Sequence, residues 1–201
     1  VLHLVVVGLM VLWAIPTIGL LVSSFRPSSE LSASGWWTAF APPYHFTMEN
    51  YSQVINQSGI GRAFLNSLFI AIPATIIPIA VAAFAAYAFS WMEFPGRDVL
   101  FVVVVGLLVV PLQTTLIPIL RAFAEWGITG EFLAVWLAHT GYGLPFAVYL
   151  LRNFMGSLPK SLFESAAMDG ANHVTAFFRV ALPLCVPAIA ALAIFQFLFV
   201  W

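Results

Sequence analysis

The chain alternates between long apolar stretches and short polar connections. The apolar stretches cover residues 1–25, 63–91, 99–121, 131–152 and 184–201. A transmembrane helix needs about 20 apolar residues, so each stretch reaches or approaches that length. The pattern predicts an all-α, polytopic transmembrane helical bundle with five spans. Because the last stretch runs to the end of the sequence, we interpret the chain as part of a longer protein.

Prolines interrupt these apolar stretches repeatedly: Pro16, Pro73, Pro78, Pro111, Pro118, Pro145 and Pro187. Membrane helices tolerate proline because neighbouring helices satisfy the freed carbonyls. We expect kinked helices around a central path, and ordinary packing kinks are the alternative.

The composition agrees with a lipid environment. Apolar residues make up 62% of the chain, charged residues only 7%, and the mean hydropathy is +1.02. The net charge of −1 comes without the clustered Lys and Arg that nucleic-acid binding needs, so no nucleic-acid partner is expected. The single Cys185 predicts neither a disulfide nor a cysteine metal site.

The basic residues indicate an orientation. Arg97, Arg152, Lys160 and Arg179 belong to one side of the membrane, and Arg26, Arg62 and Arg121 to the other. The positive-inside rule therefore predicts that 153–183 is a cytoplasmic loop and 26–61 an extracytoplasmic loop. Within the outer loop, Thr47 is expected to cap a short helix that begins near Met48.

Catalytic chemistry is not indicated. There is no GxxxxGK[ST] phosphate loop, and Lys160 is the only lysine. The four histidines lack the spacing of a metal-binding pair, so no catalytic or metal site is predicted. The apolar stretches contain almost no Asp or Glu, which disfavours an ion-coupled transporter but not a passive channel.

Neutral polar residues do occur at membrane depth. Gln113 and Thr114 follow Pro111, where unwound backbone favours a cavity, and Asn66 begins the second apolar stretch. We take Gln113, Thr114 and Asn66 as candidates for the path of a neutral polar solute. Hydrogen bonding between helices is the alternative.

The segment "ESAAMDGANHVTAFFRVALP" (164–183) is a polar insert between long apolar stretches, and it carries Glu164, Asp169, His173 and Arg179. Ser161 and Glu164 have the spacing of a capping box, which predicts the start of a helix. Gly170 is expected to end that helix in the left-handed conformation. Asn172 is expected to cap a second helix that stops before 182–183.

This helix–turn–helix is expected to dock another protein. Ala166 and Ala167 keep the first helix narrow, so a partner can approach closely. The alternative is an amphipathic hairpin on the bilayer surface, which would call for more Lys and Arg than the segment has.

The same segment resembles the EAA loop of ABC importer permeases. The match runs through Glu164, Ala166, Ala167, Asp169, Gly170, Val180, Leu182 and Pro183, with Ser165 in place of the usual Ala. The strings "FTMENY", "NSLFIA", "AYAFSWMEFPGRD", "VPLQTTLIPIL" and "LPFAVYLLRNFMGSLPKSLFESAAMDGA" are similar to the sugar branch, the maltose-type second permease. "SGWW" in the outer loop hints at the alpha-glucoside group.

The resemblance implies an ABC type I importer permease fold. Residues 1–201 would form a single transmembrane permease domain, with Trp201 starting a WN-type motif and a sixth span following. The segment that couples to the ATPase would be Glu164, Ser165, Ala166, Ala167, Met168, Asp169, Gly170 and Ala171.

The resemblance also implies the partners. They would be a second permease subunit, an ATPase dimer that holds ATP and Mg, an extracytoplasmic solute-binding protein and a sugar. The chain itself would carry no cofactor and no enzymatic activity. It would lie as a multi-pass protein in a bacterial or archaeal cytoplasmic membrane.

Three alternatives stay open at this point: a non-sugar ABC importer of the same fold, a channel or secondary transporter, and a structural membrane scaffold. Nucleotide dependence of transport separates the first from the second.

Overall fold

The computed structural model describes residues 2–57 and 59–201, and every regular element in these ranges is helical. The chain divides into two compact units, residues 1–66 and 67–201, which are described separately. The prediction of an all-α fold is confirmed. The assignment of 1–201 to a single permease domain stays a prediction.

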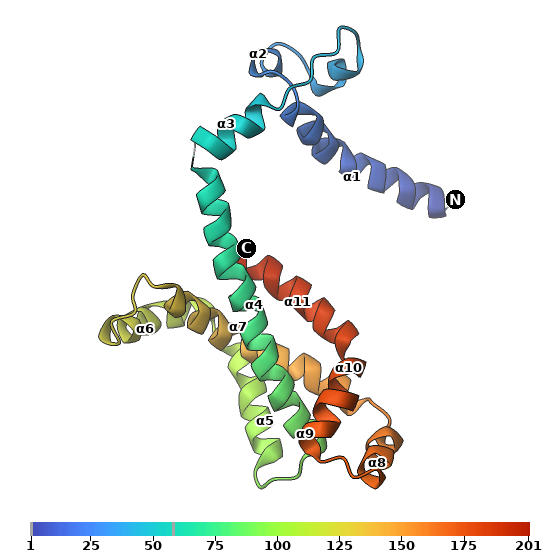
Figure 1. The fold of residues 1–201 in the computed structure, drawn as a ribbon, viewed down its shortest axis with the longest axis vertical. Coiled ribbons are helices and arrows are strands. Elements are labelled where there is room, and N and C mark those ends of the chain that lie inside the picture. Colours follow the sequence, from blue (N-terminus) through green and yellow to red (C-terminus); the bar gives the residue numbers. More distant parts are fainter. Residues whose placement is uncertain (1, 58) are drawn as a thin grey trace. The chain divides into compact units, whose positions relative to one another are not determined.

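The first unit contains one long helix and a folded loop (Figure 1). Its elements are α1 (Leu2–Ser24), α2 (Ser28–Leu31), the 3-10 helix η1 (Trp36–Phe40) and α3 (Glu49–Gln57). The α1 helix is apolar throughout and largely exposed. Trp36 packs on Gly19 of α1 so closely that a Cβ there would lie 2.8 Å from the indole Nε1.

Arg26 organises the loop of this unit. Its side chain is only 2% exposed, and its guanidinium donates to the Gly35 carbonyl at 3.0 Å and the Ser34 hydroxyl at 2.7 Å. It also pairs with Glu30, which contacts His45. A buried cation requires such partners, so this network fixes the loop.

Thr47 prepares the start of α3 as the sequence predicts. Its hydroxyl accepts a hydrogen bond from the Glu49 amide at 3.1 Å. The Phe25 carbonyl accepts from the Thr47 amide at 2.7 Å, which ties this turn to the end of α1.

The second unit begins within α4 (Ile60–Trp91). Its further elements are α5 (Arg97–Gly106), the 3-10 helix η2 (Leu107–Val109), α6 (Leu112–Glu125), α7 (Phe132–Gly156), α8 (Lys160–Met168), α9 (His173–Ala176), the π-helix η3 (Phe177–Ala181), α10 (Leu182–Leu184) and α11 (Val186–Val200).

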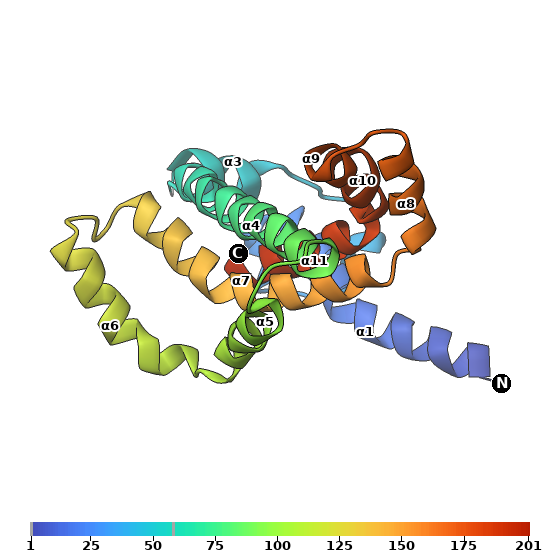
Figure 2. The same cartoon turned by 90° about the horizontal axis from the view of Figure 1, so that it is seen from below.

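Among the described residues, α1, α4 and α7 are long and apolar enough to cross a membrane, and two bent pairs bring the possible spans to five. The predicted continuous span 99–121 is corrected. It bends by 102° between η2 and α6, as Figure 2 shows for α5 and α6. The cause is Pro111: residues 110 and 111 are extended, and proline has no N–H to continue the helix.

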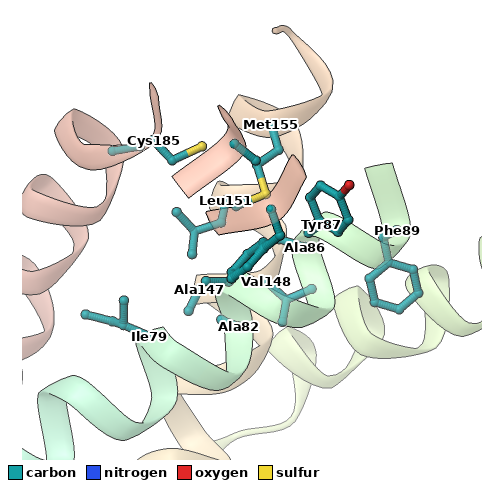
Figure 3. Close-up of a cluster of buried hydrophobic side chains, with 14 of the residues drawn as sticks. Ile79, Ala82, Ala86, Tyr87, Phe89, Ala147, Val148, Leu151, Met155 and Cys185 are labelled. Atoms are coloured by element: carbon teal, nitrogen blue, oxygen red, sulfur yellow. The ribbon is translucent and has the colours of Figure 1, made fainter. Parts of the chain in front are cut away.

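The core of this unit lies where α4, α7 and η3 meet the start of α11 (Figure 3). Ala82 and Ala86 of α4 are fully buried against Leu151 and Met155 of α7. Small residues let membrane helices approach closely, and the gain then comes from van der Waals packing rather than from water exclusion. This core holds the polar insert at one end of α4.

Candidate functional site

The helix–turn–helix at the end of α4 starts differently from the prediction. The α8 helix begins at Lys160 with Pro159 as its N-cap, and no side chain caps it. The capping box of Ser161 and Glu164 is therefore wrong. The helix begins two residues earlier than expected, directly after the extended Pro159, so Ser161 already lies inside the first turn.

The turn after α8 is a Schellman motif, as the glycine predicts. Gly170 has φ of +83°, its amide donates to the Ala167 carbonyl at 3.0 Å, and the Ala171 amide donates to the Ala166 carbonyl at 2.9 Å. A left-handed residue at this position satisfies the last carbonyls of a helix, and glycine adopts it without a Cβ penalty.

The second helix starts as predicted but runs further. The Asn172 side chain accepts from the Thr175 amide at 2.9 Å, which confirms the cap. The expected stop before 182–183 is wrong, because helical backbone continues through the π-helix and α10 to Leu184. The chain bends by 70° only at Cys185.

Aromatic side chains attach this motif to the end of α4, a feature that the sequence analysis missed. Trp91 stacks on Phe163 of α8 with ring centroids 3.7 Å apart. Tyr87 packs against Phe177 at 5.4 Å, and its hydroxyl lies 3.3 Å from Nδ1 of His173. The aromatic residues were visible in the sequence, but their pairing depends on tertiary contacts between α4, α8 and η3.

All eight residues predicted to contact the ATPase lie on one continuous segment, the second half of α8 and its turn. Glu164 and Asp169 are exposed, and no hydrogen bond or ion pair joins their carboxylates to another described residue. Met168 is 81% exposed. Methionine is enriched at protein interfaces, so this exposed side chain suits a surface that a partner covers.

The candidate path residues are spread over both units. Gln113 and Thr114 lie in the first turn of α6 and are exposed, and the Thr114 hydroxyl donates to the Pro111 carbonyl at 2.8 Å. Asn66 is exposed and belongs to the first unit. Their role in a solute path stays a prediction.

A cavity of about 550 Å³ opens inside the bend between α5 and α6, against α7. Its lining is mostly apolar and includes Thr115 and Tyr142, whose hydroxyls lie 2.8 Å apart. Thr115 follows directly after the two predicted path residues. The pairing with Tyr142 required the structure.

The long apolar helices indicate a membrane protein. The chain belongs to the family of binding-protein-dependent transport system inner membrane components, whose model matches residues 79–201. It is a permease subunit of an ABC importer.

Two curated relatives cover nearly the whole chain. The chain is 56% identical over 202 residues to the osmoprotective compounds uptake permease protein GgtD of Synechocystis sp., covering 99% of the chain and 68% of the relative. It is 38% identical over 296 residues to the alpha-glucoside transport system permease protein AglG of Rhizobium meliloti, covering 99% and 78%.

A solved structure shows the same fold. It is the crystal structure of a bacterial ABC transporter involved in the import of the acidic polysaccharide alginate. The TM-score is 0.82 over 100% of this chain and 69% of the other, with 21% sequence identity.

Proposed function

We propose that this permease takes up a neutral sugar or glycoside and that residues 164–171 dock it onto a separate ATPase dimer. The observation that carries the docking proposal is the exposed turn around Gly170, with free carboxylates and Met168 presented on a fixed platform.

The contact between α8 and the end of α4 explains how docking would move the pore. Because Trp91 stacks on Phe163, a displacement of α8 is transmitted to the end of α4. ATP and Mg would be held by the partner ATPases, whose closure favours one of two pore states by differential binding. This chain would supply the lever and half of the translocation path, and a second permease subunit the other half.

The arrangement in the membrane follows from the charge pattern. Residues 153–183 would face the cytoplasm, and 26–61 would face the solute-binding protein outside. A sixth span would follow Trp201.

Neutral polar groups support an uncharged polyhydroxylated substrate. The proposed path residues are Gln113, Thr114 and Asn66. The hydroxyl pair of Thr115 and Tyr142 is proposed as an addition to them. Amide and hydroxyl groups can each donate and accept, which suits sugar hydroxyls. AglG is named for alpha-glucoside transport, and another relative, NgcG of Streptomyces coelicolor, for diacetylchitobiose uptake.

A non-sugar osmoprotectant is the second candidate, because GgtD, at 56% identity, is named only for the uptake of osmoprotective compounds. Uptake in membrane vesicles, competed by a neutral disaccharide or by the zwitterion glycine betaine, separates the two. Competition by glycine betaine alone would exclude the sugar assignment and leave the docking proposal intact.

Docking is tested by Gly170→Ala beside Gly130→Ala. Both glycines are left-handed, with φ of +83° and +85°, and neither Cβ would meet an atom within 4 Å. Each substitution therefore carries the same backbone cost of about 1 kcal/mol. We expect only Gly170→Ala to lower ATPase recovery in the purified complex.

Charge reversal gives a second test. Glu164→Lys removes a carboxylate that has no partner in the chain, so membrane levels should be unchanged while substrate-stimulated ATP hydrolysis falls. Glu125→Lys, on the exposed end of α6, is the matched control. Full complex yield and full hydrolysis in both Gly170→Ala and Glu164→Lys would refute docking through this segment.

A further inference from the structure

Another pocket, polar and of about 360 Å³, lies where the end of α4, the start of α5 and the end of α7 meet. Its lining includes Ser90, Arg97, Arg152 and Asn153, and the only charged side chains in it are the two arginines. The proposed coupling and transport functions do not use this pocket.

Arg152 is held in place by its neighbours but forms no ion pair with a described residue. Its guanidinium lies 4.6 Å from the centroid of the Phe101 ring, and the Ser90 hydroxyl donates to its carbonyl at 3.2 Å. Nε is buried without a partner, whereas the two terminal nitrogens are not buried and make no hydrogen bond within the described chain. They are free to bind an incoming acceptor.

Arg97 is only partly neutralised. Its Nε donates to Asp98 at 3.3 Å, and one terminal nitrogen donates to the Met92 carbonyl at 3.3 Å. Asp98 is 82% exposed, and it lines a neighbouring pocket together with Arg97 and the exposed Glu93. Neither carboxylate lines the pocket of Arg152, so that pocket keeps a net positive charge.

We propose that this pocket binds the phosphate group of an anionic phospholipid. Guanidinium groups recognise phosphate through parallel N–H donors, and the Asn153 amide adds another donor. Nε of Arg152 is buried without a partner, and an anionic ligand on the same guanidinium would offset part of the cost of that burial. Basic pockets between transmembrane helices on the cytoplasmic side suit anionic lipid headgroups.

The surface next to the pocket indicates a lipid rather than free phosphate. On α5, Leu100 follows Arg97 by three residues and is 49% exposed, and on α7, Tyr149 precedes Asn153 by four residues and is 42% exposed, so both lie on the helix faces that carry the pocket residues. Acyl chains attached to a headgroup in the pocket would cover these side chains, which a free anion would leave bare.

The test uses the assembled transporter in nanodiscs with equal amounts of phosphatidylglycerol and phosphatidylcholine. Native mass spectrometry measures the ratio of the two lipids that stay bound. The wild type should retain phosphatidylglycerol preferentially, and Arg152→Gln should reduce this preference about fivefold, the effect of one basic contact. Lys160→Gln, an exposed charge outside the pocket on the same side, should leave it unchanged.

Asn153→Asp keeps the test valid if Arg152→Gln does not fold. Asn153 is exposed, so the substitution should be tolerated, and its new negative charge should repel the headgroup and reduce the preference to a similar extent. Equal retention of both lipids by the wild type, or equal losses in Lys160→Gln and Arg152→Gln, would overturn the proposal. Displacement of phosphatidylglycerol by inorganic phosphate alone would overturn the lipid assignment.

Discussion

Gly143, in the middle of α7, is the position where a single added methyl group should be most informative. A Cβ at Gly143 would lie 2.8 Å from Nε2, 3.0 Å from Oε1 and 3.1 Å from Cδ of Gln196. Gln196 is 5% exposed in α11, and its amide donates to the Ala74 carbonyl of α4 at 3.5 Å. Gly143→Ala therefore disturbs a point where three helices meet.

The magnitude follows from three contributions. Overpacking of a buried site costs about 1–3 kcal/mol. Moving the Gln196 amide away from the carbonyl of Ala74 costs a further ~0.6–2 kcal/mol for an interhelical hydrogen bond in a membrane. Replacing glycine by alanine in a helix stabilises the folded state by about 1 kcal/mol, which offsets part of this cost. We expect Gly143→Ala to be destabilising by about 0.6–4 kcal/mol.

Gly141→Ala is the matched control, two residues away on the same helix. Its Cβ would meet no atom within 4 Å, so only the gain in helix propensity applies. Thermal stability of the detergent-solubilised complex, followed by fluorescence-detected size-exclusion chromatography, should rank Gly141→Ala at or above wild type and Gly143→Ala below it.

A double-mutant cycle tests the cause. In a Gln196→Ala background the amide is gone, so adding Gly143→Ala should cost much less than in the wild type. If Gly143→Ala is as stable as Gly141→Ala, or if it destabilises the protein equally without Gln196, then a clash between residue 143 and Gln196 is not the cause of the effect.

Three further outcomes are expected. Trp91→Ala should weaken the attachment of α8 by about 1–3 kcal/mol, because one aromatic stacking contact and its buried apolar area are lost. The measurement is hydrogen exchange, which should be faster over residues 160–171 and unchanged in α1. Tyr142→Phe should lower the apparent affinity for the transported solute in uptake assays, because Thr115 loses its hydroxyl partner; unchanged uptake kinetics would remove this pair from the path. The His45 hydrogen bond holds the pKa of Glu30 below its ordinary value of 4.5. The resulting stabilisation is present above pH 4.5 and is lost as the pH falls through the lowered pKa. Hydrogen exchange in the outer loop should therefore accelerate at acid pH in the wild type. In Glu30→Gln this acceleration should be smaller.

The sequence alone determined the features that depend on neighbouring residues. Apolar runs of about 20 residues fixed the helical class, and Gly170 and Asn172 fixed the turn and the second cap, because their hydrogen bonds reach only three to five residues along the chain. The capping box at Ser161 failed for an equally local reason, since Pro159 already starts the helix there.

Only the tertiary structure decided which distant residues meet. The stacking of Trp91 on Phe163, the contact of Gly143 with Gln196 and the shared pocket of Arg97 and Arg152 each join separate helices. The way in which these helices cross sets the pairs. A linear pattern of apolar residues cannot specify them, because many faces of an all-apolar helix are equally suited to packing.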